Sequence, residues 1–308
     1  MKVTFNNNVI ETKEGTTVSK LLKKEIENNQ YQVVACRYNN EYMNLETEIN
    51  ENAKIELIDT HSKEGMKVYV RTLVYIMGKA FESLYPQEKL MVEYQLGNAM
   101  FCRCDNLKIA EEFIQKLKSK MQDIIDKNLK IKKVVMNREE AKEFFKETHT
   151  SKGKLQIDLE NNNEIYIYYC EKYFNYCYGV LANRTGIIDK FDIIEYHNGF
   201  LIRYPSSKNP TELPEFKETK KLAWALEEFD KIHDVLGVSR VYNLNKAIDE
   251  NKIEDIIMLA EALHEKKIAN IADEIAKRKN VKMVLIAGPS SSGKTTFAQR
   301  LGIQLRLN

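Results

Sequence analysis

VKMVLIAG, residues 281–288, runs directly into PSSSGKTT, residues 289–296, and then into the helical pattern FAQRLGIQLRL. The stretch from Gly288 to Thr295 fits G-x-x-x-x-G-K-[ST], with an apolar β-branched run before it and a helix after it. Glycines and small serines let successive backbone N–H groups turn inward and bind an anion at a helix N-terminus. The stretch therefore predicts a strand from Val281, a phosphate-binding loop and a following helix.

Each residue type in this loop has an expected role. The backbone of Ser290 to Gly293 would cradle a β-phosphate, Lys294 would stabilise the transferring phosphate, and the Thr295 hydroxyl would ligate Mg²⁺. The residues predicted to bind the nucleotide are Gly288, Pro289, Ser290, Ser291, Ser292, Gly293, Lys294, Thr295 and Thr296. Lys294 is the predicted catalytic residue, and ATP and Mg²⁺ are the predicted cofactors.

Only twelve residues follow Thr296. Phosphoryl transfer also needs a carboxylate that holds Mg²⁺ and groups that position the nucleophile, and in such folds these come from later strands and loops. We therefore expect the chain to be the N-terminal part of a longer kinase-like protein, with no phosphoryl-transfer turnover of its own. We also expect rapid amide exchange beyond Val281, because one strand and one helix cannot bury the faces of a parallel sheet.

Composition narrows the class of protein. Lys plus Arg is 47 against 45 for Asp plus Glu, and this net charge of +2 gives no reason by itself to invoke a polyanion. The five cysteines form no C-x-x-C pair, and the five histidines show no metal-ligand spacing. No apolar run approaches the ~18 residues of a membrane span, and the N-terminus lacks a signal-peptide core. We expect a soluble cytoplasmic protein without membrane contact, and its oligomeric state stays open.

Residues 1–60 alternate short strand patterns with one amphipathic helix. Strands are predicted at Lys2–Phe5, Val9–Thr12, Val33–Arg37 and Lys54–Ile58, and the helix is VSKLLKKEIENN. A small sheet that holds one helix is a β-grasp arrangement. The phrases EGTTVSKLL and NENAKIELID resemble the TGS domain found at the front of threonyl-tRNA synthetases, which implies a docking module without chemistry of its own.

Residues 61–204 predict a second α+β domain. A helix with Met66, Leu73 and Phe81 on one face ends at Pro86, and Asn137 with Glu140 forms a capping box for a later helix. Further helix and strand patterns include a long helix from Ile109 and strands at 90–96, 99–103 and 134–136 and in LQIDL, EIYIYY and FLIRY.

RTLVYIMGKAFESLYP and CYGVLANRTGIIDKF make this region similar to the second additional domain of threonyl-tRNA synthetases, which removes wrongly attached amino acids. By that resemblance the family's H-x-x-x-H and C-x-x-x-H ligand positions correspond to Arg71, Tyr75, Cys177 and Leu181. Arg71 is a permanent cation and Leu181 has no donor atom, so we predict no zinc site here. Cys177 is expected to pack rather than to act as a nucleophile.

Lysines are dense before and after residue 125: Lys116, Lys118, Lys120, Lys127, Lys130, Lys132 and Lys133. Interspersed Asp123 and Asp126 favour a solvated face over an RNA-binding stripe. The alternating tyrosines of residues 166–178 are explained by strand packing before base stacking.

Residues 205–280 begin with three prolines in PSSKNPTELP, which predicts an exposed connector. Helices are then expected up to Gly237, near Asn243 and from Ile253 to Ile275. Residues 281–308 would start a P-loop domain. The predicted fold class is therefore α+β multidomain, with a β-grasp domain, an editing-domain-like domain, a helical bridge and the first strand, loop and helix of a P-loop α/β domain.

The order of these parts resembles a bacterial family of uridine kinase-like nucleoside kinases with a threonyl-tRNA synthetase-like N-terminal half. The resemblance implies transfer of the ATP γ-phosphoryl group to a nucleoside hydroxyl, with a nucleoside as the substrate. The alternative is a tRNA- or ribonucleotide-recognition module in residues 1–204 that has no editing activity. A trans-editing hydrolase would need the zinc ligands that the sequence has replaced.

Overall fold

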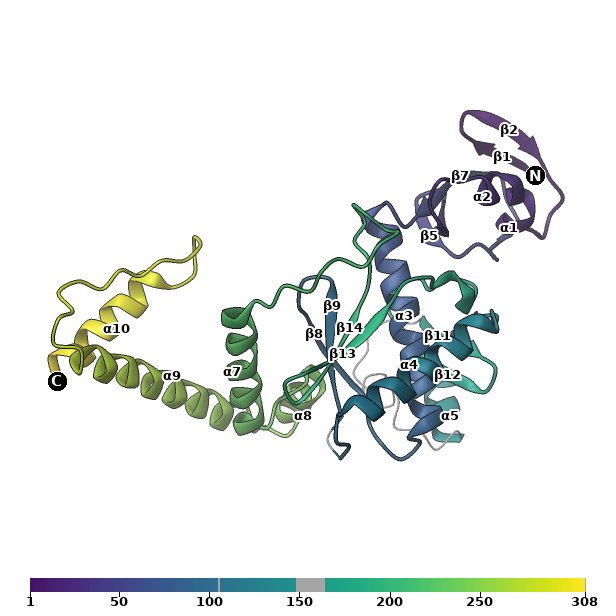
Figure 1. The fold of residues 1–308 in the computed structure, drawn as a ribbon. Helices are drawn as coiled ribbons and strands as arrows, with labels where there is room; N and C mark the ends of the chain where they lie inside the picture. The colour runs from purple at the N-terminus through teal and green to yellow at the C-terminus, as the bar shows by residue number, and fades with distance from the viewer. Residues whose placement is uncertain (105, 148–163, 308) are drawn as a thin grey trace. The chain divides into compact units, whose positions relative to one another are not determined.

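The computed structural model describes residues 1–104, 106–147 and 164–307 (Figure 1). The chain forms two compact units, Met1–Thr219 and Lys220–Asn308. The finer predicted boundaries, after residues 60, 204 and 280, stay predictions. The predicted strand LQIDL and His149 lie outside the described residues. Within the described residues, no helix combines the length and the apolar character that a membrane crossing requires.

The first unit begins with a five-stranded sheet in the order β2-β1-β7-β4-β5. Its strands are β1 (Lys2–Phe5), β2 (Asn8–Glu11), β4 (Val33–Tyr38), β5 (Glu41–Met43) and β7 (Ala53–Asp59). The pairing of β1 with β7 is parallel and the other pairings are antiparallel. A two-stranded sheet joins β3 (Thr16–Thr17) to β6 (Glu48–Ile49).

The helix predicted from Val18 is broken into α1 (Val18–Leu21) and α2 (Lys23–Glu27). The break lies at Leu22, whose φ of −105° and ψ of 29° leave the helical region. Leu22 is fully buried among the apolar residues of the sheet, together with Val3 and Ile55. The β-grasp arrangement is confirmed.

The second part of the first unit is organised around α3 (Lys63–Leu84). The Ser62 hydroxyl accepts a hydrogen bond from the Gly65 N–H at 3.0 Å, so it caps the first turn. The helix ends at Tyr85, since Pro86 disfavours a helical conformation in the residue before it. This end agrees with the prediction.

Two sheets pack around α3 and α4 (Glu111–Asp126). The four-stranded antiparallel sheet has the order β13-β14-β9-β8, with β8 (Met91–Gln95), β9 (Ala99–Arg103), β13 (Asp192–Tyr196) and β14 (Gly199–Arg203). Its core joins Leu73, Leu117 and Phe200. A single 3₁₀ turn, η1 (Thr185–Ile187), contacts both helices.

The three-stranded antiparallel sheet has the order β10-β11-β12, with β10 (Lys132–Met136), β11 (Ile165–Cys170) and β12 (Tyr173–Tyr176). Before α5 (Arg138–Glu147), the Asn137 N–H donates to Glu140 at 2.8 Å, and the Glu140 N–H donates to the Asn137 side chain at 2.9 Å. The predicted capping box is confirmed.

The second unit contains α7 (Lys220–Leu236), α8 (Val241–Asp249), α9 (Ile253–Ala276) and α10 (Lys294–Leu307). Gly237 follows α7 with a φ of +68°, a conformation that favours glycine. The helix α10 packs on α9 through Leu301, Ile268 and Ala272. The strand predicted from Val281 is wrong: residues 220–307 hold no strand, so the apolar run has no neighbour with which to pair.

Candidate functional site

The four positions where the resemblance places metal ligands come together in the first unit. Arg71 and Tyr75 lie one turn apart on α3, and Cys177 and Leu181 belong to the loop after β12. Three of them share one apolar cluster, in which Tyr75 and Leu181 are buried and Cys177 packs against them. The four positions that the resemblance names therefore lie close together in this structure.

The centre of this site is filled by side chains. The Tyr75 hydroxyl donates to the backbone oxygen of Tyr168 at 3.0 Å, and its ring meets the edge of Tyr173 at a centroid distance of 5.0 Å. Leu181 is fully buried beside them. Arg71, Tyr75 and Leu181 do not fit a zinc ion, because a cation, a buried phenol and an alkyl group replace three ligands. Within the described residues, no group of three or more His, Cys, Asp and Glu side chains could hold a metal.

Cys177 is the one position that keeps a ligand-type side chain. Burial raises the pKa of its thiol to about 11, and the opposing effect of Arg71 is smaller. The thiol is therefore protonated near neutral pH, and only the thiolate is an effective nucleophile. This environment agrees with the predicted packing role.

A groove of about 390 Å³ opens beside Arg71. We call it the Arg71 groove, and it is lined by Glu41, Tyr42, Met43, Glu64, Lys67, Val68, Arg71, Lys133, Tyr166, Gly179 and Val180. The Arg71 guanidinium lies against the backbone of Gly179, where an added Cβ would be 2.9 Å from its Cζ. Gly179 also has a φ of +85°, so both the close approach and the backbone conformation require glycine.

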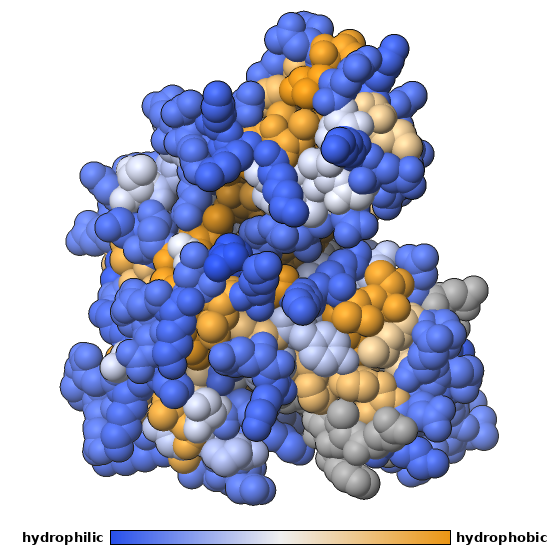
Figure 2. All heavy atoms as spheres, turned by 90° about the vertical axis from the view of Figure 1, so that its right-hand side faces the viewer, coloured by the Kyte–Doolittle hydropathy of each residue, from blue (hydrophilic) through white to orange (hydrophobic). Residues whose placement is uncertain are grey.

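The groove is lined by three cations and two acids, which leaves a net charge of +1. Neither Lys67 nor Arg71 forms an ion pair with any residue that the structure describes. The Lys133 ammonium lies 3.6 Å from the centroid of the Tyr166 ring, and burial lowers the pKa of Lys133. The acids Glu41 and Glu64 and the aromatic rings of Tyr42 and Tyr166 line the same groove as these three cations. Figure 2 shows one face of the molecule, where hydrophilic side chains predominate and apolar side chains are exposed between them.

The predicted phosphate loop lies in the second unit. Six of its nine predicted residues line one cavity of about 590 Å³: Gly288, Pro289, Ser292, Gly293, Lys294 and Thr296. Ser290, Ser291 and Thr295 do not line it. Positive φ angles of 60° at Ser291 and 74° at Gly293 turn the backbone before α10 begins at Lys294.

The Lys294 ammonium donates to the backbone oxygen of Pro289 and lies 3.5 Å from the Ser292 hydroxyl, so it folds back across the loop. The same cavity includes His264 and Arg300, whose ring nitrogen and guanidinium are 3.4 Å apart. His264 is one of the five histidines that show no metal-ligand spacing in the sequence. No local signal joins α9 to the loop, since 24 residues separate His264 from Gly288.

Comparisons with known proteins found one matching family model and a group of similar tRNA ligases. The model of the ThiS family matches residues 3–61, which cover the β-grasp sheet. The chain is also similar to threonine–tRNA ligases. A probable cytoplasmic threonine–tRNA ligase of Enterocytozoon bieneusi is 31% identical over 199 residues, which are 63% of this chain and 30% of that relative.

Two bacterial relatives are also threonine–tRNA ligases. The threonine–tRNA ligase of Clostridium tetani is 28% identical over 188 residues, 60% of this chain and 29% of the relative. That of Staphylococcus carnosus is 25% identical over 196 residues, 63% of this chain and 30% of the relative. The chain thus spans about a third of the length of these relatives. A ThiS-type β-grasp domain and homology to threonyl-tRNA synthetases are established.

The predicted nucleoside kinase is wrong. The relatives are threonine–tRNA ligases, and neither a kinase nor a uridine-like acceptor finds support in them. The prediction rested on the loop motif and on a resemblance in the order of the parts, and the relatives support only the synthetase-like part of that resemblance. The relatives instead favour the alternative, a recognition module derived from a tRNA synthetase.

Proposed function

We propose that the first unit recognises a tRNA or a ribonucleotide and does not hydrolyse it. The observation that supports this function most directly is the Arg71 groove, which lies on the helix where the resemblance puts the metal ligands. Its cations Lys67 and Arg71 have no acidic partner in the described chain. Unpaired cations beside aromatic rings suit a ligand that carries both phosphates and bases.

The chemistry of the groove supports binding better than catalysis. Arg71 offers a planar guanidinium that can hold a phosphate with two parallel hydrogen bonds, and the Tyr42 and Tyr166 rings add aromatic surface to the groove. Hydrolysis would need an activated water or a nucleophile. The replaced zinc positions supply no Lewis acid, and the pKa of Cys177, raised to about 11 by burial, keeps its thiol protonated.

The test is the mobility of labelled tRNA with the whole chain over a range of salt concentrations. We expect binding that weakens steeply as salt rises, because phosphate contacts release counterions. Arg71→Ala should weaken binding at every salt concentration, whereas Arg306→Ala removes an equal charge from the exposed end of α10 and should not. Absence of any complex at low salt would reject the function, and stoichiometric zinc with tRNA-ester hydrolysis would reject the non-catalytic assignment.

We also propose that Gly288–Thr296 binds the phosphate groups of a nucleotide such as ATP. The motif and the backbone turned by Ser291 and Gly293 support this assignment. Lys294 would exchange its bond to Pro289 for phosphate oxygens, and the Thr295 hydroxyl would hold Mg²⁺. Calorimetric titration with ATP and Mg²⁺ should give heat that Lys294→Ala abolishes and that Thr295→Ala makes independent of Mg²⁺. Equal heats for the parent chain and Lys294→Ala would reject the assignment.

A further inference from the structure

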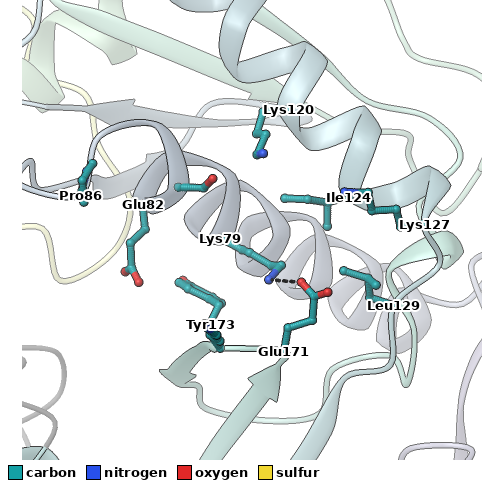
Figure 3. A pocket seen from close by; sticks show the side chains of 11 residues that line it. Lys79, Glu82, Pro86, Lys120, Ile124, Lys127, Leu129, Glu171 and Tyr173 are labelled. Carbon is teal, nitrogen blue, oxygen red and sulfur yellow. Dashed lines mark ion pairs between the residues drawn. The ribbon is translucent and has the colours of Figure 1, made fainter.

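Tyr75, Tyr168 and Tyr173 belong to one buried cluster, which we call the tyrosine cluster. A second cavity of the first unit lies further along α3, past this cluster. We call it the lysine cavity; it measures about 360 Å³ and is lined by Lys79, Glu82, Ser83, Pro86, Lys120, Ile124, Lys127, Leu129, Glu171, Lys172 and Tyr173 (Figure 3). Lys79 follows Tyr75 by one turn and Arg71 by two, so these residues share one helix face. The Tyr75 and Tyr173 rings, packed edge to face, belong to the cluster on this face.

Lys79 is a fixed cation in the wall of this cavity. Its side chain is only 12% exposed, and its ammonium lies 2.9 Å from a carboxylate oxygen of Glu171. It also donates to the backbone oxygen of Cys170 at 3.0 Å. Glu171 stands at the turn between β11 and β12 with a φ of +57°. Lys79 is therefore held in place, and its charge is largely balanced by one acid.

The three other lysines that line the cavity differ from Lys79, and from two neighbouring lysines outside the cavity, in having no acidic partner in the described chain. On α4, Lys116 pairs with Glu112 at 2.6 Å and Lys118 pairs with Asp192 at 2.7 Å. Lys120 and Lys127 follow on the same helix and at its end, and neither forms an ion pair within the described chain. Lys172, next to Glu171, likewise has no ion-pair partner among the described residues. On α4 and at its end, the two paired lysines, Lys116 and Lys118, thus lie outside the cavity, and Lys120 and Lys127, which line it, have no ion pair.

The composition of the cavity favours an anion. Four lysines face two glutamates, which leaves a net charge of +2 around an apolar floor of Ile124, Leu129 and Tyr173. A metal cation would be repelled. Lysine ammoniums are point charges without a fixed fork, which suits contacts to a phosphate backbone that do not depend on base sequence.

We propose that the lysine cavity contacts the backbone phosphates of the RNA that the first unit binds. This inference rests on the proposed recognition function and adds a second contact, on the same face of α3 as Arg71. Lys127 and Lys172 are exposed, so a single small anion would compete with water there. A polyanion gains free energy from the counterions that it releases at such a surface.

The experiment compares two double variants of the whole chain. Lys120→Ala with Lys127→Ala removes two cavity charges, and Lys116→Ala with Lys118→Ala removes two paired charges from the same helix. Both change the net charge equally, so a difference in tRNA affinity reports the position of the charge. We expect the cavity variant to reduce the slope of log K against log salt by roughly 0.7 to 0.9 for each lost phosphate contact, and the paired variant to change it less.

Lys120→Arg with Lys127→Arg keeps the charges and should retain binding. Thermal unfolding of each variant checks that α4 is intact, and the arginine pair also keeps the inference testable if the alanine pair unfolds. If the parent chain binds tRNA and the two alanine variants bind equally, the lysine cavity is rejected while tRNA recognition stands. If the parent chain binds no tRNA, the recognition function itself fails and the inference fails with it.

Discussion

Two stretches of this chain are both rich in apolar residues, but only one of them forms a strand. GFLIR, residues 199–203, forms β14, in which Phe200, Leu201 and Ile202 are fully buried between β13 and β9. VKMVLIA, residues 281–287, forms no strand, and Met283 and Leu285 are 76% and 85% exposed. The comparison shows that an apolar β-branched run becomes a strand only where neighbouring backbones satisfy its N–H and C=O groups.

The largest expected difference between these stretches is in amide hydrogen exchange. The amides of β14 belong to a central strand, so they should exchange through opening with a free energy near that of global unfolding, about 5–15 kcal/mol. Amides of residues 282–287 should exchange close to the rate of an unstructured peptide. Mass spectrometry of peptides from both stretches provides the measurement. Strong protection of residues 282–287 in the isolated monomer would contradict the comparison.

Local sequence signals predicted local structure well. The end of α3 before Pro86 and the Asn137–Glu140 capping box each depend on a few neighbouring residues. The β-grasp sheet was also predictable, because its strand and helix patterns are short and follow in order.

Features that need distant residues were not predictable. The lysine cavity joins Lys79 of α3, Lys120 of α4 and Lys172 of a hairpin turn, and no spacing in the sequence relates them. The loop motif at Gly288 indicated phosphate chemistry but contained no information on the 287 residues before it. The kinase prediction joined this local motif to a resemblance in the order of the parts, and the relatives corrected it.

A second test of this comparison truncates one buried side chain of β14 and one exposed side chain of residues 281–287. Ile202→Ala should lower the free energy of unfolding of the first unit by about 2–5 kcal/mol, because it opens a cavity at a fully buried position of the sheet. Leu285→Ala should change stability by about 0.5 kcal/mol or less. Urea unfolding followed by circular dichroism measures both variants, and similar losses would show that residues 281–287 are packed.

Thiol reactivity tests the same contrast chemically. Burial raises the pKa of Cys177 to about 11, whereas a cysteine placed by Leu285→Cys should titrate near ~8.5. At pH 8 the native thiol should therefore react with iodoacetamide roughly 100-fold more slowly, since only the thiolate attacks. Arg71→Ala should slow it further, because Arg71 lowers this pKa. Faster alkylation of Cys177 in Arg71→Ala would show that the thiol had become exposed instead.

The smallest expected effects come from two helical glycines with opposite surroundings. A Cβ at Gly78 of α3 would clash with the hydroxyl oxygen of Tyr173, a buried ring between the lysine cavity and the tyrosine cluster. A Cβ added at Gly302 of α10 would have no atom within 4 Å. Gly78→Ala should cost about 1–3 kcal/mol through overpacking, despite the better helix propensity of alanine. Gly302→Ala should stabilise α10 by about 0.5–1 kcal/mol, because alanine loses less backbone entropy.

Thermal unfolding of the two glycine variants measures changes of opposite sign. The double variant Gly78→Ala with Tyr173→Phe tests the cause of the lost stability. The second change removes the hydroxyl oxygen that the new methyl group meets. If that oxygen is the obstacle, Tyr173→Phe should recover most of the lost stability. A Gly78→Ala variant as stable as the parent chain would instead mean that Tyr173 shifts freely. The side of the lysine cavity that Tyr173 lines would then be mobile.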